Sequence, residues 1–236
     1  SELYIEKGVK MTDDLDDRDI LLGVKEVPIN MLIPNKTYFF FSHTIKMQPY
    51  NRDLLRAILE KNIRLIDYEL LTDSRGHRVI AFGRYAGVVG AYNGLRAFGE
   101  QSGRYHLRPA HQCEDREEME AELTSLELPK GFKIAITGNG RVGKGAMEIL
   151  KAAGIKEISV NDFIHEEFDH PVYTLLEVTN YYKRKDGGPS DRQEIFSNPE
   201  PYESDFMRFA KVADLYIACH FWDSRAPFIF SRDDMK

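Results

Sequence analysis

Short apolar runs separated by polar segments characterise the first part of the chain. Ile20 to Val24 and Tyr38 to Phe41 are apolar and bounded by polar residues, as is typical of strands buried on both faces of a parallel sheet. After Asn51, a favoured N-cap residue, apolar residues recur at helical spacing up to Asn62, and Ile63 to Asp67 follows as a third strand-like run. The pattern predicts a parallel α/β arrangement.

A second group of elements leads to the middle of the chain. We expect a strand at Arg78 to Phe82 and a helix from Arg84 to about Gln101, whose many Gly and Ala residues allow close approach to a neighbour. Glu114 to about Leu126 predicts a charged helix with an apolar stripe, and Pro129-Lys130-Gly131 ends it. The boundary between two domains is therefore expected between about residues 103 and 131, which gives domains of residues 1–115 and 116–236.

The second half opens with a strand, helix and strand. Phe132 to Thr137 is a buried strand, a helix runs through Leu150 to a stop at Gly154, and Glu157 to Asn161 is expected to be the next strand. Residues 163 to about 204 are polar for most of their length, and we expect a long, partly mobile excursion there. Ala213 to Ala218 is predicted to be the last strand.

The composition supports a folded protein and argues against two classes of partner. Of the 236 residues, 42% are hydrophobic, which is enough to bury a sizeable core. The 38 acidic side chains outnumber the 32 basic ones, so the net charge of −6 has the wrong sign for a protein that mainly binds nucleic acid. The chain has no run near the roughly 18 apolar residues that a membrane span needs. We expect a soluble, cytoplasmic protein that binds neither nucleic acid nor a membrane.

The cysteines and a pair of histidines do not indicate a metal site. Cys113 and Cys219 lie far apart and outside any C-x-x-C pattern, so both are predicted to be reduced, buried thiols. His165 and His170 flank acidic residues in the manner of a zinc motif, but they are five residues apart and would not share a helix face.

A glycine-rich turn is the strongest chemical signal in the sequence. Gly138, Gly140 and Gly143 follow a predicted buried strand and open a predicted helix. This context gives the tight turn, the close approach of backbone to a pyrophosphate and the helix packing that a dinucleotide site needs. Arg141 and Val142, between the second and third glycines, belong to the same predicted cofactor-binding turn.

Asp162 completes the predicted cofactor site. It lies 19 residues past Gly143, at the end of the expected second strand, where a carboxylate can accept hydrogen bonds from the ribose hydroxyls of NAD and repel the 2′-phosphate of NADP. NAD is therefore favoured over NADP. Two other interpretations stay open: a P-loop, although Gly145 replaces its hydroxyl residue, and a glycine-rich turn that binds no ligand.

Charged side chains follow the predicted strands of the first domain. Lys25 comes directly after the first run and His43 two residues after the second, so both would project at the carboxyl edge of a parallel sheet, where ligands bind. Lys46 adds a second cation, while Glu26 and Glu69 supply carboxylates that could tune the lysines and the imidazole. A surface ion-pair network with a structural histidine would explain the same charges.

Several blocks of the chain, in order, resemble a known family. They are Gly23-Val24-Lys25-Glu26-Val27-Pro28, Phe41-Ser42-His43-Thr44-Ile45-Lys46, Ile63 to Glu69, Arg78 to Gly83 with Tyr85-Ala86-Gly87, and the closing stretch from Asn198 to Trp222. These blocks are similar to the lysine-forming saccharopine dehydrogenases and to the lysine-ketoglutarate reductase domain of the bifunctional lysine-degrading enzyme. Both are relatives of alanine dehydrogenase and the transhydrogenase α subunit. The resemblance covers most of the chain.

The resemblance implies a fold, a reaction and roles for particular residues. It implies two Rossmann-like α/β domains with mostly parallel sheets and an inter-domain cleft, and NAD-dependent chemistry at a secondary amine that joins lysine to glutarate. Lys25 and His43 match the acid-base pair, in which the lysine accepts the amine proton and the histidine moves protons while water adds to an imine. Lys46 and Arg78 match positions near the substrate. The implied partners are amino acids and 2-oxoacids, and a homo-oligomer is left open.

The chain also departs from the family. Family members begin with a further strand and helix and extend beyond the position of Lys236, so the first domain is expected to be incomplete, in a fragment or a natural short form. Two other functions stay open, an alanine dehydrogenase-like enzyme that reduces a 2-oxoacid with ammonia, and a non-catalytic NAD-binding module.

Overall fold

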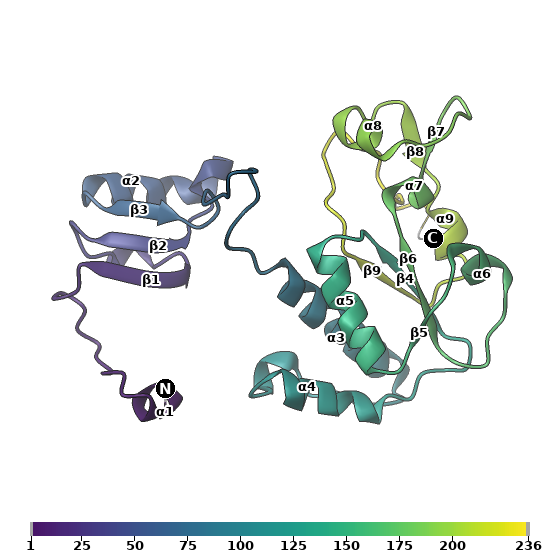
Figure 1. The fold of residues 1–236 in the computed structure, drawn as a ribbon, viewed down its shortest axis with the longest axis horizontal. Helices are drawn as coiled ribbons and strands as arrows, with labels where there is room; N and C mark the ends of the chain where they lie inside the picture. The colour runs from purple at the N-terminus through teal and green to yellow at the C-terminus, as the bar shows by residue number, and fades with distance from the viewer. Residues whose placement is uncertain (1, 235–236) are drawn as a thin grey trace. The chain divides into compact units, whose positions relative to one another are not determined.

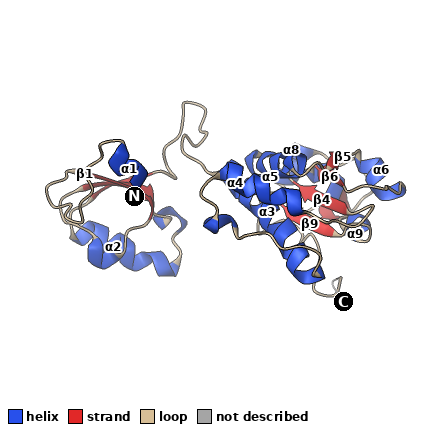
Figure 2. Cartoon of the chain, turned by 90° about the horizontal axis from the view of Figure 1, so that it is seen from below, coloured by secondary structure: helices blue, strands red, loops and turns tan. Residues whose placement is uncertain are grey.

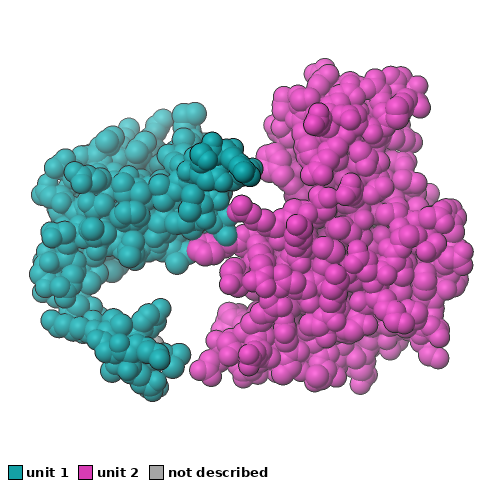
Figure 3. All heavy atoms as spheres, viewed as in Figure 1, with its two compact units in different colours: residues 1–81 teal, residues 82–236 magenta. Residues whose placement is uncertain are grey.

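The chain forms two compact units in a computed structural model that describes residues 2–234. The units are residues 1–81 and 82–236, coloured separately in Figure 3. The division therefore falls earlier than the expected boundary after residue 115. The reason is that helix α3 (Gly83–Ser102), which we placed in the first domain, packs into the core of the second unit.

The first unit is a small parallel sheet with one long helix (Figure 1). Its elements are α1 (Glu2–Glu6), β1 (Ile20–Lys25), β2 (Thr37–Phe41), α2 (Arg52–Glu60) and β3 (Arg64–Asp67). The strand order is β1-β2-β3, and both pairings are parallel. The parallel sheet predicted from the apolar runs is thus confirmed.

The core of this unit lies on one face of the sheet. Leu54 and Ile58 of α2 pack with Tyr38 and Phe40 of β2, all nearly inaccessible to solvent. The expectation that β1 is buried on both faces is wrong, because β1 is an edge strand and α2 covers only one face. Leu22 accordingly remains 74% exposed.

The strand expected at Arg78 to Phe82 does not form. Arg78 makes one isolated antiparallel bridge with Thr72, and α3 begins at Gly83. Val79 and Phe82 are exposed. Beyond this single bridge, the segment pairs with no strand among the described residues. Its β propensity alone is not enough to form a strand, because a strand is stabilised by packing against neighbouring strands.

The second unit contains a four-stranded sheet between helices (Figure 2). Its elements are α3, α4 (Arg116–Glu122), β4 (Lys133–Thr137), α5 (Arg141–Ala152), β5 (Lys156–Glu157), α6 (Val160–His165), β6 (Val172–Leu176), α7 (Val178–Tyr181), β7 (Tyr182–Arg184), α8 (Arg192–Ser197), β8 (Tyr202–Ser204), α9 (Met207–Ala210) and β9 (Leu215–Ala218). The sheet order is β5-β6-β4-β9 with all pairings parallel, and β7 and β8 form an antiparallel pair. No helix in the described part of the chain is long and apolar enough to cross a membrane.

Two hydrophobic cores lie on opposite faces of this sheet. Ile134 and Ile136 of β4 face the core that contains α3 and α5, whereas Ala135 faces the core that contains Phe163 of α6 and Phe209 of α9. All five residues of β4 are buried, as expected of a central strand in a parallel sheet. The strand predicted from Phe132 to Thr137 is confirmed and forms the centre of the unit.

Helices α3 and α5 approach each other closely because of their glycines. A Cβ added to Gly87 of α3 would lie 1.8 Å from the carbonyl oxygen of Val142, and one added to Gly145 of α5 would lie 1.9 Å from that of Arg84. Only glycine fits at such a distance. The expected role of small residues in helix packing is therefore confirmed.

Two expectations for the second half are wrong. The strand expected from Glu157 to Asn161 ends at Glu157, and Ser159 caps helix α6 by accepting a hydrogen bond from the Asp162 N–H. Residues 163–204 are regular for much of their length. They include β6, whose apolar Val172-Tyr173-Thr174-Leu175-Leu176 run pairs directly with β4.

Candidate functional site

The glycine turn after β4 has the geometry that its sequence predicts. Gly138 has φ of +91°, a left-handed conformation, and its N–H donates to the Leu176 carbonyl oxygen at 2.9 Å. A Cβ added to Gly143 would lie 1.9 Å from the carbonyl oxygen of Gly138. These two glycines are therefore required by the turn itself.

Gly140 has a different environment, which fits a phosphate ligand. It is the N-cap of α5, no side chain caps the helix there, and a Cβ added to it would meet no atom within 4 Å. Arg141 and Val142 form the first positions of the helix behind it. The uncapped N–H groups at the start of a 12-residue helix, with open space in front of them, form a cradle suited to a pyrophosphate.

A pocket opens at this turn on the carboxyl side of the sheet. Three segments besides the turn contribute to it, those that follow β6 and β9 and helix α8. The lining residues are Gly138, Asn139, Gly140, Glu177, Val178, Tyr181, Arg192, Phe196, Cys219, His220 and Phe221. Because β6 and β9 flank β4 on either side, the pocket lies where ligands bind in open α/β sheets.

Glu177 is the acidic residue at this pocket, and the sequence analysis missed it. It follows the last residue of β6 directly, and its Oε1 accepts a hydrogen bond from Asn139 Nδ2 at 2.8 Å. It also forms a reciprocal cap with Asn180 at the start of α7. The apolar run of β6 followed by a carboxylate is the signal that could have identified it.

Asp162 lies elsewhere in this unit. It is in the first turn of α6 and is not among the residues that line the pocket. Strand β5, which leads to it, is separated from β4 by β6. Glu157 pairs with Tyr173, three residues before Leu176, so β5 ends about 10 Å short of the level of the glycine turn. The structure therefore does not bring Asp162 to the glycine turn.

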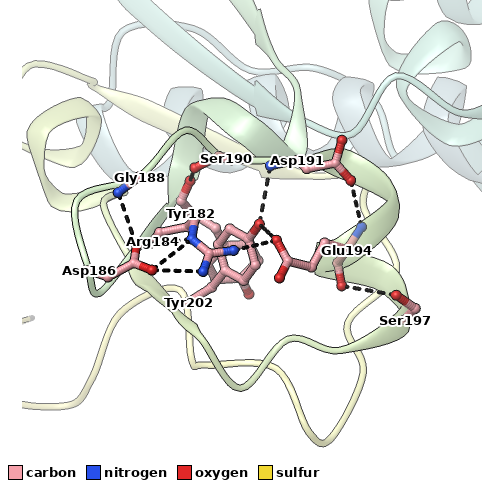
Figure 4. Close-up of polar contacts among 9 residues, drawn as sticks. All are labelled: Tyr182, Arg184, Asp186, Gly188, Ser190, Asp191, Glu194, Ser197 and Tyr202. Carbon is pink, nitrogen blue, oxygen red and sulfur yellow. Dashed lines mark hydrogen bonds and ion pairs between the residues drawn. The ribbon is translucent and has the colours of Figure 1, made fainter.

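One wall of the pocket is built by the segment from β7 to β8. Figure 4 shows the Arg184 guanidinium between two carboxylates, with Asp186 Oδ2 at 2.7 Å and Glu194 Oε2 at 2.6 Å. The Tyr202 hydroxyl donates to the same Glu194 oxygen at 2.6 Å. Hydrogen bonds from Tyr202 and Arg184 lower the pKa of Glu194 and keep it ionised. This network fixes α8 against the β7–β8 pair.

Helix α8 presents a cation and an aromatic ring to the pocket. Arg192 and Phe196 both line it, and the Arg192 guanidinium lies 5.8 Å from the centre of the Phe196 ring. On the other side of the turn, Cys219 is buried and its thiol is not in a disulfide. Burial raises the pKa of Cys219 to about 11, so the thiol is neutral. Cys113 is also free but only half-buried.

In the first unit, a basic residue and an imidazole lie at the carboxyl edge of the sheet. Lys25 ends β1 and pairs with Phe41, the last residue of β2. The Lys25 ammonium lies 5.6 Å from the centre of the Phe41 ring, and the His43 ring stacks with the same ring at 6.5 Å between centroids. Nδ1 of His43 lies 3.7 Å from Glu26 Oε2.

His43 is held in an uncommon backbone conformation. Its φ of +56° places it in the left-handed region, which costs about 1 kcal/mol for a residue with a side chain. The neighbouring Ser42 is fully buried and donates from Oγ to Asp67 Oδ2 at 2.5 Å, while Asn51 Nδ2 donates to the His43 carbonyl oxygen at 3.3 Å. Asn51 thus supports this turn and does not cap α2 with its side chain.

The remaining predicted residues form an ion cluster next to this turn. Glu69 Oε1 accepts from Arg78 Nη2 at 2.8 Å and lies 3.2 Å from Lys46 Nζ. The Glu69 side chain is only 5% exposed, whereas Lys46 and Arg78 are nearly half exposed. Glu69 Oε2 is buried without a hydrogen-bond partner in the described residues. A buried carboxylate oxygen without a partner is costly, which suits a site that receives a further group.

The structure thus brings the predicted site residues other than Asp162 together in two groups, one in each unit. Lys25, Glu26, His43, Lys46, Glu69 and Arg78 gather at the carboxyl edge of the first sheet. The glycine turn forms a separate pocket in the second unit. His170 contacts the adjacent Asp169 at 2.7 Å, and no group of metal ligands is found among residues 2–234.

The chain is similar to known proteins along its whole length. Residues 1–89 match the family "Alanine dehydrogenase/PNT, N-terminal domain". The mitochondrial alpha-aminoadipic semialdehyde synthase of Bos taurus is 35% identical over 99% of this chain and 28% of its own length. The saccharopine dehydrogenase (NAD+, L-lysine-forming) of Candida glabrata is 34% identical over 60% of this chain and 41% of its own length.

A solved L-alanine dehydrogenase aligns with 74% of this chain and 48% of its own, at 14% identity and a TM-score of 0.46. The chain spans about a quarter of the length of the synthases and less than half of the Candida glabrata enzyme. The sequence matches to the synthase and to the Candida glabrata enzyme agree with the family resemblance described for the sequence. The chain is thus similar to the saccharopine dehydrogenases and the alpha-aminoadipic semialdehyde synthases, and its first 89 residues match a domain family of alanine dehydrogenase.

Proposed function

We propose that the protein is an NAD-dependent oxidoreductase that acts on a secondary amine and interconverts saccharopine with lysine and 2-oxoglutarate. The observation that carries the proposal is that the Lys25 ammonium and the His43 ring both lie next to the Phe41 ring, with Glu26 Oε2 3.7 Å from His43 Nδ1. A surface ion-pair network does not require a left-handed histidine supported by a buried serine and aspartate. Strained residues of this kind are concentrated at functional sites.

The two residues have complementary roles in this reaction. Lys25 in its neutral form accepts the proton of the secondary amine as the adjacent carbon is oxidised. His43, oriented by Glu26, then moves protons while water adds to the resulting imine and the carbon–nitrogen bond breaks. An imidazole suits this second step because it gains and loses a proton near neutral pH.

The ion cluster of Lys46, Glu69 and Arg78 serves substrate binding. Glu69 holds both cations through one oxygen, so their positions are fixed relative to each other. The exposed Arg78 guanidinium is suited to a substrate carboxylate, because its planar donors match two carboxylate oxygens. The buried, unpartnered Glu69 Oε2 is suited to a substrate ammonium group.

The glycine-turn pocket holds the cofactor in this proposal. When bound, a nicotinamide dinucleotide accepts the hydride from the carbon beside the amine. The N–H groups at the start of α5 would hold the pyrophosphate in front of Gly140, and Glu177 would accept hydrogen bonds from the adenosine ribose. A carboxylate at that position disfavours the 2′-phosphate of NADP, which is why we propose NAD.

An absorbance assay of nicotinamide reduction and oxidation tests the function. With the whole protein we expect turnover of saccharopine with NAD, and the reverse reaction with lysine, 2-oxoglutarate and NADH. The match of residues 1–89 to an alanine dehydrogenase domain favours a second candidate, which predicts turnover of pyruvate with ammonia and none of lysine. Binding of NADH without turnover of either substrate pair would indicate the non-catalytic module.

The location and assembly of the protein stay predictions. The Bos taurus relative is named mitochondrial, so the expected cytoplasmic location is not confirmed. Microscopy of the tagged protein would decide its location in the cell. Its mass in solution would decide the oligomeric state.

A further inference from the structure

Three side chains form a connected group beside the glycine turn, and no role above uses them. Thr137 Oγ1, at the end of β4, lies 2.7 Å from Nδ1 of His220 and 2.9 Å from the hydroxyl of Tyr216 in β9. Thr137 is fully buried, and the half-buried His220 lines the pocket. The ring of Tyr181 packs on the imidazole with 5.6 Å between centroids. The imidazole is therefore held from two sides.

The hydroxyl protons determine what His220 offers to the pocket. Tyr216 and Thr137 each carry one hydroxyl proton, and both find acceptors when Tyr216 donates to Thr137 and Thr137 donates to His220 Nδ1. If instead His220 Nδ1–H donated to Thr137 and Thr137 donated to Tyr216, the hydroxyl proton of Tyr216 would have no protein acceptor among the described residues. Only the first direction pairs the hydroxyl proton of the partly buried Tyr216 within the protein, so the first direction is favoured. The proton of the neutral imidazole then lies on Nε2, which has no partner in residues 2–234.

The position of His220 indicates which part of a dinucleotide it meets. Glu177 follows β6 on one side of β4, and His220 follows β9 on the other side. A dinucleotide with its adenosine ribose at Glu177 and its pyrophosphate at the start of α5 must extend its second half towards β9. The second half contains the nicotinamide ribose.

We propose that Nε2–H of His220 donates a hydrogen bond to a hydroxyl of the nicotinamide ribose, and that Thr137 positions the imidazole for this contact. The assignment rests on the proposed binding of NAD in the glycine-turn pocket. Burial lowers the pKa of His220, which agrees with a neutral ring that has a single N–H to donate. Nothing in the glycine motif itself points to this residue.

Calorimetry with two fragments of the cofactor tests the assignment in the 236-residue chain. ADP-ribose carries both riboses and both phosphates, whereas ADP lacks the second ribose. We expect His220→Ala to weaken ADP-ribose binding about fivefold, the effect of losing one hydrogen bond between neutral groups, and to leave ADP binding unchanged. His111→Ala, at an exposed histidine of the same unit, should change neither affinity.

Variants of Thr137 test its positioning role separately. Thr137→Val keeps the shape of the side chain but removes the hydroxyl, so ADP-ribose binding should weaken about threefold while ADP binding is kept. Thr137→Ser restores the hydroxyl and should restore the affinity. If Thr137→Val does not fold, the half-buried His220 still provides the test through His220→Ala.

Each outcome bears on a different claim. Unchanged ADP-ribose affinity in His220→Ala, or an equal loss for ADP and ADP-ribose, would overturn the contact with the second ribose while leaving the cofactor site intact. A chain that binds neither fragment would overturn the cofactor site itself, and the role of His220 with it.

Discussion

Asn139 in the glycine turn donates a hydrogen bond to Glu177 at the end of β6, with 2.8 Å between Nδ2 and Oε1. This contact ties the turn that would hold a pyrophosphate to the carboxylate that would hold a ribose. It joins residues 38 positions apart in the sequence, in the segments that follow two neighbouring strands of the sheet. The cofactor site therefore depends on the pairing of β4 with β6 as much as on the glycine motif.

Cofactor preference should follow Glu177. We expect Glu177→Ser to weaken NADH binding about tenfold and to strengthen NADPH binding, because it removes both a ribose acceptor and a negative charge near a 2′-phosphate. Asp162→Ser is the matched control and should leave both affinities unchanged. Calorimetry with the two cofactors decides between the residues, and a loss of NADH binding in Asp162→Ser alone would restore the prediction made from the sequence.

The glycines of the turn should respond differently to substitution. A Cβ added to Gly140 meets no protein atom within 4 Å, so Gly140→Val should fold normally and lose cofactor binding by obstructing the pyrophosphate. Gly143→Ala should instead destabilise the second unit by about 2 kcal/mol, because its Cβ would lie 1.9 Å from the carbonyl oxygen of Gly138. Urea unfolding and calorimetry separate the two effects. Normal cofactor affinity in folded Gly140→Val would show that the turn binds no pyrophosphate.

The acid-base pair should be essential for turnover but not for cofactor binding. Lys25→Met and His43→Gln should each lower kcat about a hundredfold or more in the whole protein, the effect typical of losing a positioned acid or base. The double variant should lose much less than the product of the single effects if the residues act as one unit. His77→Gln, at an exposed histidine of the same unit, is the control. Near-native turnover of both single variants across the pH range would contradict the catalytic assignment.

Acid should weaken an ion-pair network in the second unit. Arg84 of α3 and Arg116 of α4 both contact Glu148 of α5 at 2.7 Å, and their hydrogen bonds lower the pKa of Glu148 to about 2. Because the folded pKa lies below the ordinary value of 4.5, the stabilisation is fully present above pH 4.5 and is lost as the pH falls towards 2. The residues are partly exposed, so we expect a contribution of only about 1 kcal/mol.

Urea unfolding at several pH values measures this contribution. Glu148→Gln should lower the free energy of unfolding at pH 7, and its difference from the unchanged chain should shrink between pH 4.5 and 3. Glu167→Gln, at an exposed position, should show no such dependence. A difference that stays constant over this range would mean that packing, and not charge, accounts for the effect of the substitution.

The sequence by itself determined the elements whose signals are local. The apolar runs at β1, β2 and β4, the helical spacing in α2 and the glycines of the turn depend on neighbouring residues, so each could be identified without knowing the sheet order. The same holds for Lys25 and His43, because a residue directly after a parallel strand lies at its carboxyl edge whatever the order of the strands. Those predictions needed only the direction of each strand.

Only the tertiary structure decided which strands are neighbours. The prediction placed Asp162 at the end of the second strand along the chain, but β6, the third strand, lies beside β4, and β5 lies at the edge of the sheet. The apolar residues of β6 do not specify their partner, because any parallel strand offers the same backbone groups. Glu177 and His220 line the pocket because β6 and β9 flank β4 in the folded unit. Which distant segments pair as neighbouring strands is set by the packing of the whole unit.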